Sequence, residues 1–151
     1  LGDVYKRQIP QGVIFMICTF FGHRDCPSQI ELSLKQQIVN LIENYSVDTF
    51  YVGNNGNFDK IVYKTLSSLK CTYEIKIYVI LAYLPNNDAF SSDSIYPEGI
   101  EKVPPKFAIP WRNKWMVNNS DYVIAFLRHD FGGAAKSVEY AEKKCIKVIR
   151  I

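Results

Sequence analysis

The chain alternates between two patterns of apolar positions. Short, nearly continuous apolar runs predict buried strands over 16–21, 48–53, 75–83, 121–128 and 147–151. Between them, apolar residues recur every three or four positions and predict helices over 28–45, 59–69, 110–120 and 135–144. Strands that alternate with helices are typical of a parallel sheet covered on both faces. The pattern therefore predicts the α/β class: a single Rossmann-like three-layer domain with a mostly parallel sheet of about five strands.

Glycine follows three of the predicted strands. Gly22 ends the first, Gly53 and Gly56 follow the second, and Gly132 and Gly133 precede the last helix. These turns are expected at the carboxyl edge of the sheet, where open α/β sheets bind ligands. Helix amides and the helix dipole favour anions there, and glycine lets a phosphate approach the backbone. The three turns together predict a phosphate-binding edge.

The first of these turns contains His23-Arg24-Asp25, the tripeptide of a protein-kinase catalytic loop. A kinase loop needs an asparagine five residues after its aspartate, and Ile30 stands there instead. We therefore exclude a kinase and interpret His23 and Arg24 as candidate phosphate contacts. Ser28 and Glu31 have the spacing of a capping box, which predicts that the following helix begins at Ser28.

Composition narrows the choice of partners. The 151 residues are 48% hydrophobic and 22% charged, with a net charge of +3 and no run of basic residues. This predicts one domain with a substantial core, and nucleic acid as an unlikely partner. The four cysteines are scattered, so we expect reduced thiols in the cytoplasm, with no metal site and no cofactor. No apolar stretch is long enough to cross a membrane, and assembly into a homo-oligomer is compatible with these features.

The first fifteen residues are expected to stand apart from the domain. Residues 3–8, DVYKRQ, look like the translated end of a sequencing adapter, which makes Met16 the natural start. A short disordered extension and a signal peptide are the alternatives. We therefore expect 1–15 to be a non-native or disordered extension and 16–151 to be the domain.

The second half of the chain resembles the SLOG superfamily, which includes LOG phosphoribohydrolases, Smf DNA-processing proteins and YpsA-like proteins. LOG members carry an arginine on a helix, a strand that begins Ala-Asp, and then Pro-Gly-Gly-x-Gly-Thr-x-x-Glu. This chain has Arg112, Ser120-Asp121 and the stretch 131–139, FGGAAKSVE, in which Phe131 replaces the proline and Ala135-Lys136 replaces Gly-Thr. The opening TFFGHRDC is similar to uncharacterised YpsA-like proteins of Firmicutes and their phages. The second turn also matches the Smf and YpsA-like pattern, through Gly53, Gly56 and Asp59.

The resemblance implies binding of a nucleotide or nucleotide-derived ligand at the carboxyl edge of the sheet, with a sensor as one role. The expected ligand-binding residues are Gly22, His23, Arg24, Gly53, Asn54, Gly56, Asp59, Arg112, Gly132, Gly133 and Ala134. An alternative is an enzyme, a LOG-like phosphoribohydrolase that cleaves the N-glycosidic bond of nucleoside monophosphates with Arg112 and Glu139 as catalytic residues. A third reading is a DNA-associated Smf-like module, which the mild charge disfavours.

Several of these residues also have an ordinary structural interpretation. Arg112 and Glu139 are compatible with solvated helix faces. Asp59 has the position of a helix N-cap, and Trp111 and Trp115 are suited to packing as well as to stacking. The tertiary structure decides between these readings where it brings the residues together or keeps them apart.

Overall fold

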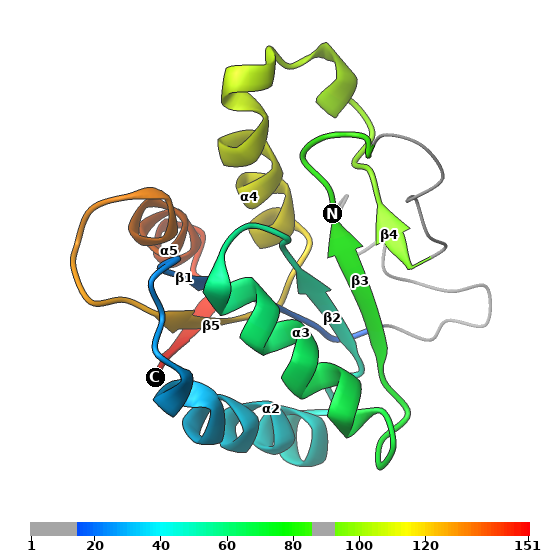
Figure 1. The fold of residues 1–151 in the computed structure, drawn as a ribbon. Coiled ribbons are helices and arrows are strands. Elements are labelled where there is room, and N and C mark those ends of the chain that lie inside the picture. Colours follow the sequence, from blue (N-terminus) through cyan, green and yellow to red (C-terminus); the bar gives the residue numbers. More distant parts are fainter. Residues whose placement is uncertain (1–14, 86–92) are drawn as a thin grey trace.

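The computed structural model describes residues 15–85 and 93–151 (Figure 1). The first described range comprises β1 (Ile17–Gly22), a 3-10 turn (Ser28–Ile30), α2 (Glu31–Tyr45), β2 (Thr49–Val52), α3 (Asn57–Leu69) and β3 (Lys76–Ile80). The rest comprises β4 (Ser94–Ile95), two 3-10 turns (Ile100–Lys102 and Pro105–Phe107), α4 (Ala108–Asn118), β5 (Tyr122–Phe126), α5 (Gly133–Lys143) and β6 (Lys147–Arg150).

The strands form one six-stranded sheet in the order β4-β3-β2-β1-β5-β6, and every neighbouring pair is parallel. From β1 the chain moves outward through β2 and β3 to β4. The chain then returns through α4, which is the crossover connection, and places β5 on the other side of β1. The order therefore reverses at β1 and β5, where ligand crevices form in open α/β sheets. The predicted Rossmann-like α/β fold is confirmed, and its sheet has one more strand than expected.

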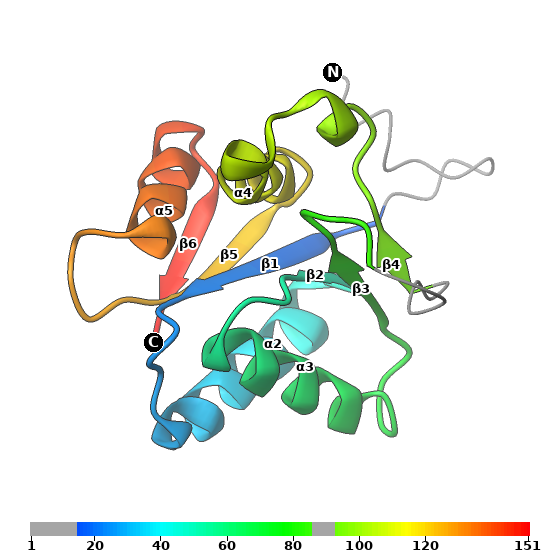
Figure 2. The same cartoon turned by 45° about the horizontal axis from the view of Figure 1, so that its top comes forward.

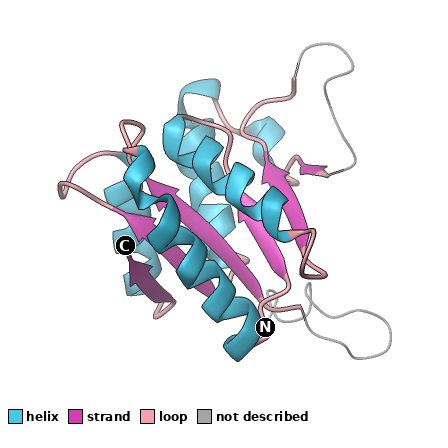
Figure 3. Ribbon diagram, turned by 60° about the horizontal axis from the view of Figure 1, so that its bottom comes forward, coloured by secondary structure: helices cyan, strands magenta, loops and turns pink. Residues whose placement is uncertain are grey.

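Helices cover both faces of this sheet. α2 and α3 pack on one face and α4 and α5 on the other (Figures 2 and 3). The larger core lies under α2 and α3, where the side chains of Leu34, Ile38 and Leu66 are almost fully buried against the sheet. On the other face, Met116 of α4 and Val138 of α5 are equally buried. Burial of both sheet faces explains why the strands are nearly continuous apolar runs.

The helix after β1 starts later than the capping-box pattern predicts. Ser28–Ile30 forms a 3-10 turn, and α2 begins at Glu31 without a side-chain hydrogen bond at its N-cap. Pro27 holds an extended conformation, and the amide of Ile30 donates to its carbonyl at 3.4 Å. The amide of Glu31, from which the Ser28 hydroxyl was expected to accept, donates instead to the Ser28 carbonyl and closes the 3-10 turn.

The long stretch between the third predicted strand and the next helix contains more structure than its irregular composition predicts. Its described part forms the two-residue edge strand β4 and two 3-10 turns, and α4 begins at Ala108. The predicted extension 1–15 lies outside the described residues, except for Phe15, whose ring lies 4.6 Å from Lys76 Nζ. Within the described ranges, no helix combines the length and apolar character needed to cross a membrane.

Candidate functional site

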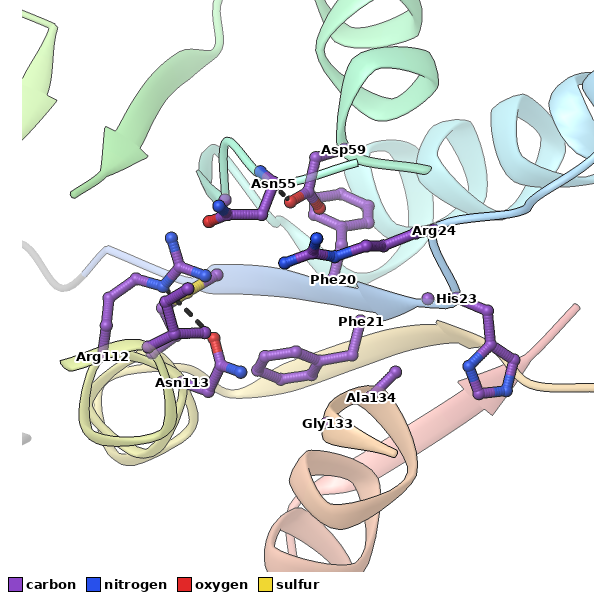
Figure 4. A pocket seen from close by; sticks show the side chains of 14 residues that line it. Phe20, Phe21, His23, Arg24, Asn55, Asp59, Arg112, Asn113, Gly133 and Ala134 are labelled. Carbon is purple, nitrogen blue, oxygen red and sulfur yellow. Dashed lines mark hydrogen bonds between the residues drawn. The ribbon is translucent and has the colours of Figure 1, made fainter. Parts of the chain in front are cut away.

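A pocket of about 260 Å³ opens where the strand order reverses. It lies between the carboxyl ends of β1 and β2, the start of α3, the inner face of α4 and the amino end of α5 (Figure 4). The sequence-predicted residues that line it are Gly22, His23, Arg24, Gly53, Asp59, Arg112, Gly133 and Ala134. Residues from five separate elements therefore meet at the edge that the glycine turns predict.

Arg112 forms one wall of the pocket. Its side chain is buried, with 3% exposed, and Nη1 donates to the Ile80 carbonyl at 3.1 Å and to Asn54 Oδ1 at 3.2 Å. Nε donates to Asn113 Oδ1 at 3.2 Å. Burial lowers the pKa of this guanidinium, and the carboxylate of Asp59 acts in the opposite direction. Arg112 is thus no solvated helix residue; it ties α4 to the ends of β2 and β3.

Asp59 lies across the pocket in the first turn of α3. Gly56 is the N-cap of this helix, so Asp59 has a different role: its Oδ2 accepts a hydrogen bond from the amide of Asn55 at 2.8 Å. Burial raises the pKa of the Asp59 carboxyl, whereas that hydrogen bond and the charges of Arg112 and Arg24 lower it. A Cβ at Gly53 would lie 2.7 Å from Asp59 Oδ2, so any other residue there would displace this carboxylate.

The raised pKa of Asp59 has a measurable consequence for stability. The folded protein holds this proton more tightly than the unfolded chain, whose pKa is near 3.8. The contribution to the free energy of unfolding is therefore present below that pH and is lost as pH rises through the folded pKa. Urea unfolding from about pH 4 to pH 7 should show a larger loss of stability for the wild type than for Asp59→Asn, which keeps an oxygen acceptor. Equal losses of stability in the two proteins would contradict a raised pKa for Asp59.

His23 brings an unused polar atom to the same edge. Its side chain is 7% exposed, its amide donates to the Phe126 carbonyl at 3.3 Å, and its Nε2 has no hydrogen-bond partner within the described residues. Asn55 Oδ1 is the other buried side-chain atom in this state. Buried polar atoms are almost always paired in native proteins, by protein, by ordered water or by a ligand. Both residues line the pocket, and these two atoms need a water or a ligand as their partner.

The remaining predicted residues lie around the pocket rather than in its lining. Gly56 and Gly132 are the N-caps of α3 and α5, both with positive φ. Asn54 is exposed and lines a neighbouring hollow with Tyr63, while its side chain reaches Arg112. Glu139 faces a different hollow beyond β5, and its Oε1 pairs with Lys143 Nζ at 3.1 Å. The structure does not bring Glu139 together with Arg112.

The sequence did not single out two polar residues of the lining, Asn55 and Asn113. Asn55 stands between Gly53 and Gly56 in the second turn, and Asn113 follows Arg112 directly, so each adjoins a predicted site residue. Asparagine is common in turns and on helix surfaces, so its presence there does not mark a residue as part of a binding site. The part of the chain that the structure describes contains no group of His, Cys, Asp or Glu side chains arranged to hold a metal ion.

The fold and the pocket define a Rossmann-like α/β domain with a ligand crevice at its switch point. No protein-family model and no curated protein matches the chain. Among solved structures, DNA processing protein A from Streptococcus pneumoniae is similar, with a TM-score of 0.62 and 17% identity over 98% of this chain and 58% of that one. The Helicobacter pylori protein, described for its single-stranded DNA binding mode, has a TM-score of 0.55 and 17% identity over 89% and 64%.

These likenesses concern the fold. The chain spans about three fifths of the length of the solved structures that it matches. At 17% identity these structures show the Rossmann-like fold, and the superfamily that the sequence resembles stays a prediction.

One expectation is contradicted. Nucleic acid was judged an unlikely partner because the net charge is only +3. The same fold, however, occurs in a protein described for binding single-stranded DNA. Net charge is a poor guide here because a single strand can be bound by a local groove and by base stacking.

Proposed function

We propose that the pocket binds a nucleotide or nucleotide-derived ligand through its phosphate. The observation that carries the proposal is the meeting of three anion-binding features in one pocket: the amino end of α5 at Gly133 and Ala134, the guanidinium of Arg24, and the buried, unpaired His23 Nε2. The first-turn amides of an eleven-residue helix point outward from its amino end and favour a phosphate. A charged hydrogen bond from Arg24 adds to that attraction.

The opposite wall suits the sugar or base of the ligand. Asn55 offers an unpaired carbonyl oxygen, and Asp59 offers carboxylate oxygens at the same edge. Arg112 holds this wall in place because its hydrogen bonds already join α4 to Asn54 and Ile80. Under this proposal Arg112 orients the pocket, and the phosphate lies toward Arg24 and α5.

Gly133→Val tests the phosphate position. Nothing lies within 4 Å of a Cβ built at Gly133, so the variant should fold, but its side chain would stand over the helix amides. Nucleotide affinity should fall more than tenfold, and a tenfold loss corresponds to about 1.4 kcal/mol of binding free energy. Calorimetric titration with a panel of mono- and dinucleotides, and with the matching nucleosides, measures this.

The matching nucleoside is the ligand control, because it lacks the phosphate. It should bind the variant and the wild type alike, and thermal melting should show that the variant is folded. Arg24→Ala should also weaken the nucleotide and spare the nucleoside, and His23→Ala should have a smaller effect in the same direction. A folded Gly133→Val that binds nucleotides as tightly as the wild type would overturn the proposal.

Single-stranded DNA is a second candidate ligand, favoured by the likeness to the Helicobacter pylori protein. A nucleotide unit within a strand carries the same phosphate and base as a free nucleotide. The phosphoribohydrolase reading has weaker support, because Glu139 and Arg112 line different hollows. The TFFGHRDC turn supports a place near the YpsA-like proteins of Firmicutes and their phages within the superfamily.

A further inference from the structure

Three rings form a continuous column from the pocket to the surface. The rings of His23 and His129 stack with centroids 3.7 Å apart and planes 27° apart. The rings of His129 and Phe131 stack with centroids 3.8 Å apart and planes 13° apart. Two rings this close to His129 and nearly parallel to it cannot share one of its faces, so His23 and Phe131 lie on opposite sides.

The two ends of the column differ in their environment. His23 is 7% exposed and lines the pocket, whereas Phe131 is 66% exposed. Phe131 belongs to the segment between β5 and α5, which Figure 1 shows as a loop. Since His129 covers one face of the Phe131 ring, the exposed area lies on its edges and on the other face. The backbone at Phe131 is also tied to His129, because His129 Nδ1 donates to the Phe131 carbonyl at 3.0 Å. A phenyl ring is thus presented to solvent next to the amino end of α5.

We propose that the outer face of Phe131 is a stacking platform for a base of single-stranded nucleic acid, next to the nucleotide unit whose phosphate occupies the pocket. This rests on the proposed function of that pocket. A planar aromatic face accepts any base, so the platform would bind a strand without reading its sequence. With this platform, the proposed ligand is a strand that carries at least one base besides the nucleotide in the pocket.

The charges beside the platform suit this occupant. Arg128 precedes His129, and its side chain is half exposed with Nη1 4.0 Å from Asp25 Oδ2. The same guanidinium lies 5.6 Å from the Phe126 ring. An exposed ion pair and an exposed cation–π contact each contribute little to stability, so the guanidinium can turn to a backbone phosphate at small cost. Arg24 lies in the pocket beyond His23. A strand from the pocket to Phe131 would therefore have a cation near each end and an aromatic face for its base.

The test compares a dye-labelled (dT)12 strand with dTMP on the full chain. Phe131→Ala should weaken (dT)12 binding about tenfold, because stacking on one aromatic side chain has that order of effect. It should leave dTMP binding within about twofold, since a lone nucleotide fills only the pocket. Phe131→Trp should keep (dT)12 affinity, and Phe131→Leu should lose it, because leucine is apolar without a flat aromatic face. Leu32→Ala is the matched control: Leu32 is 67% exposed on α2, on the other face of the sheet, and should change neither affinity.

The two arms separate the platform from the pocket. If (dT)12 binds Phe131→Ala as well as the wild type, or binds the wild type no tighter than dTMP does, the platform is wrong while the pocket stands. If the wild type binds dTMP but Phe131→Leu retains full (dT)12 affinity, the contact is apolar rather than stacked and the platform is again wrong. If the wild type binds neither ligand at millimolar concentration, both proposals fail.

Discussion

Replacing Arg112 by methionine is expected to lower the free energy of unfolding by about 3 kcal/mol at neutral pH. Methionine has a similar length, so the change removes charge and hydrogen bonds more than volume. The Ile80 carbonyl and Asn54 Oδ1 lose a donor, and the Asp59 carboxyl loses the nearby cation that opposes the rise in its pKa. An uncompensated buried charge is among the costliest defects that a single substitution makes. Urea unfolding at constant ionic strength measures the change.

Two further variants isolate the cause. Lys114→Met removes an exposed positive charge from the same helix, and we expect it to change stability by no more than about 0.5 kcal/mol. Arg112→Met combined with Asp59→Asn should recover part of the loss, because the remaining carboxylate is removed as well. If Arg112→Met is as stable as the wild type, the guanidinium is not a structural part of the pocket wall. It would then be available to the ligand, as the sequence resemblance implies.

Gly22→Ala is expected to destabilise the protein by a similar amount, about 3 kcal/mol, through overpacking. A Cβ at Gly22 would overlap the ring of Phe58, which is 1% exposed and stacks against Phe126. The ring atoms nearest to it lie close to the Phe58 backbone, so a rotamer change cannot remove the overlap easily. The carboxyl end of β1 would have to move away from α3, and the pocket would widen. Thermal melting and urea unfolding of the purified variant measure the effect.

Gly133→Ala is the matched control for Gly22→Ala, because a Cβ at Gly133 meets nothing within 4 Å. It should change stability by no more than about 0.5 kcal/mol. A second variant tests the mechanism. In Gly22→Ala combined with Phe58→Leu, the smaller side chain makes room for the Cβ. The double variant should therefore lose less stability than the sum of the losses of the two single variants. A Gly22→Ala protein with the melting temperature of the wild type would show that β1 and α3 are not packed as closely as described.

Most of the fold could be predicted from the sequence. The strand and helix patterns located the elements to within a few residues, with β1, β2, α3, β5 and α5 all inside or next to the predicted ranges. β4 was missed because two residues are too few to show a period, and their strand conformation depends on pairing with β3. The capping-box prediction was wrong because the turn Ser28–Ile30 closes through backbone hydrogen bonds, from the Ile30 amide to Pro27 and from the Glu31 amide to Ser28.

The site was predicted in part, and the reason can be seen in particular residues. Gly22, Gly53 and Gly133 follow from the rule that ligand turns stand at the carboxyl ends of strands. Asn55 and Asn113 have no such local signal. Arg112 was predicted by resemblance as a ligand contact, whereas its hydrogen bonds to Ile80 and Asn54 bring together three segments that are distant in the chain.

The sequence by itself determined the α/β class, the order of elements and the edge at which the glycine turns gather, because apolar period and turn composition are local properties. Only the tertiary structure decided which residues meet. β5 lies beside β1 because the chain crosses back over α4, and this places Arg112 opposite Asp59 and separates Glu139 from both. The same strand pairing brings His129 and Phe131 onto His23. Contacts between such distant residues depend on strand order and packing, which no local pattern encodes.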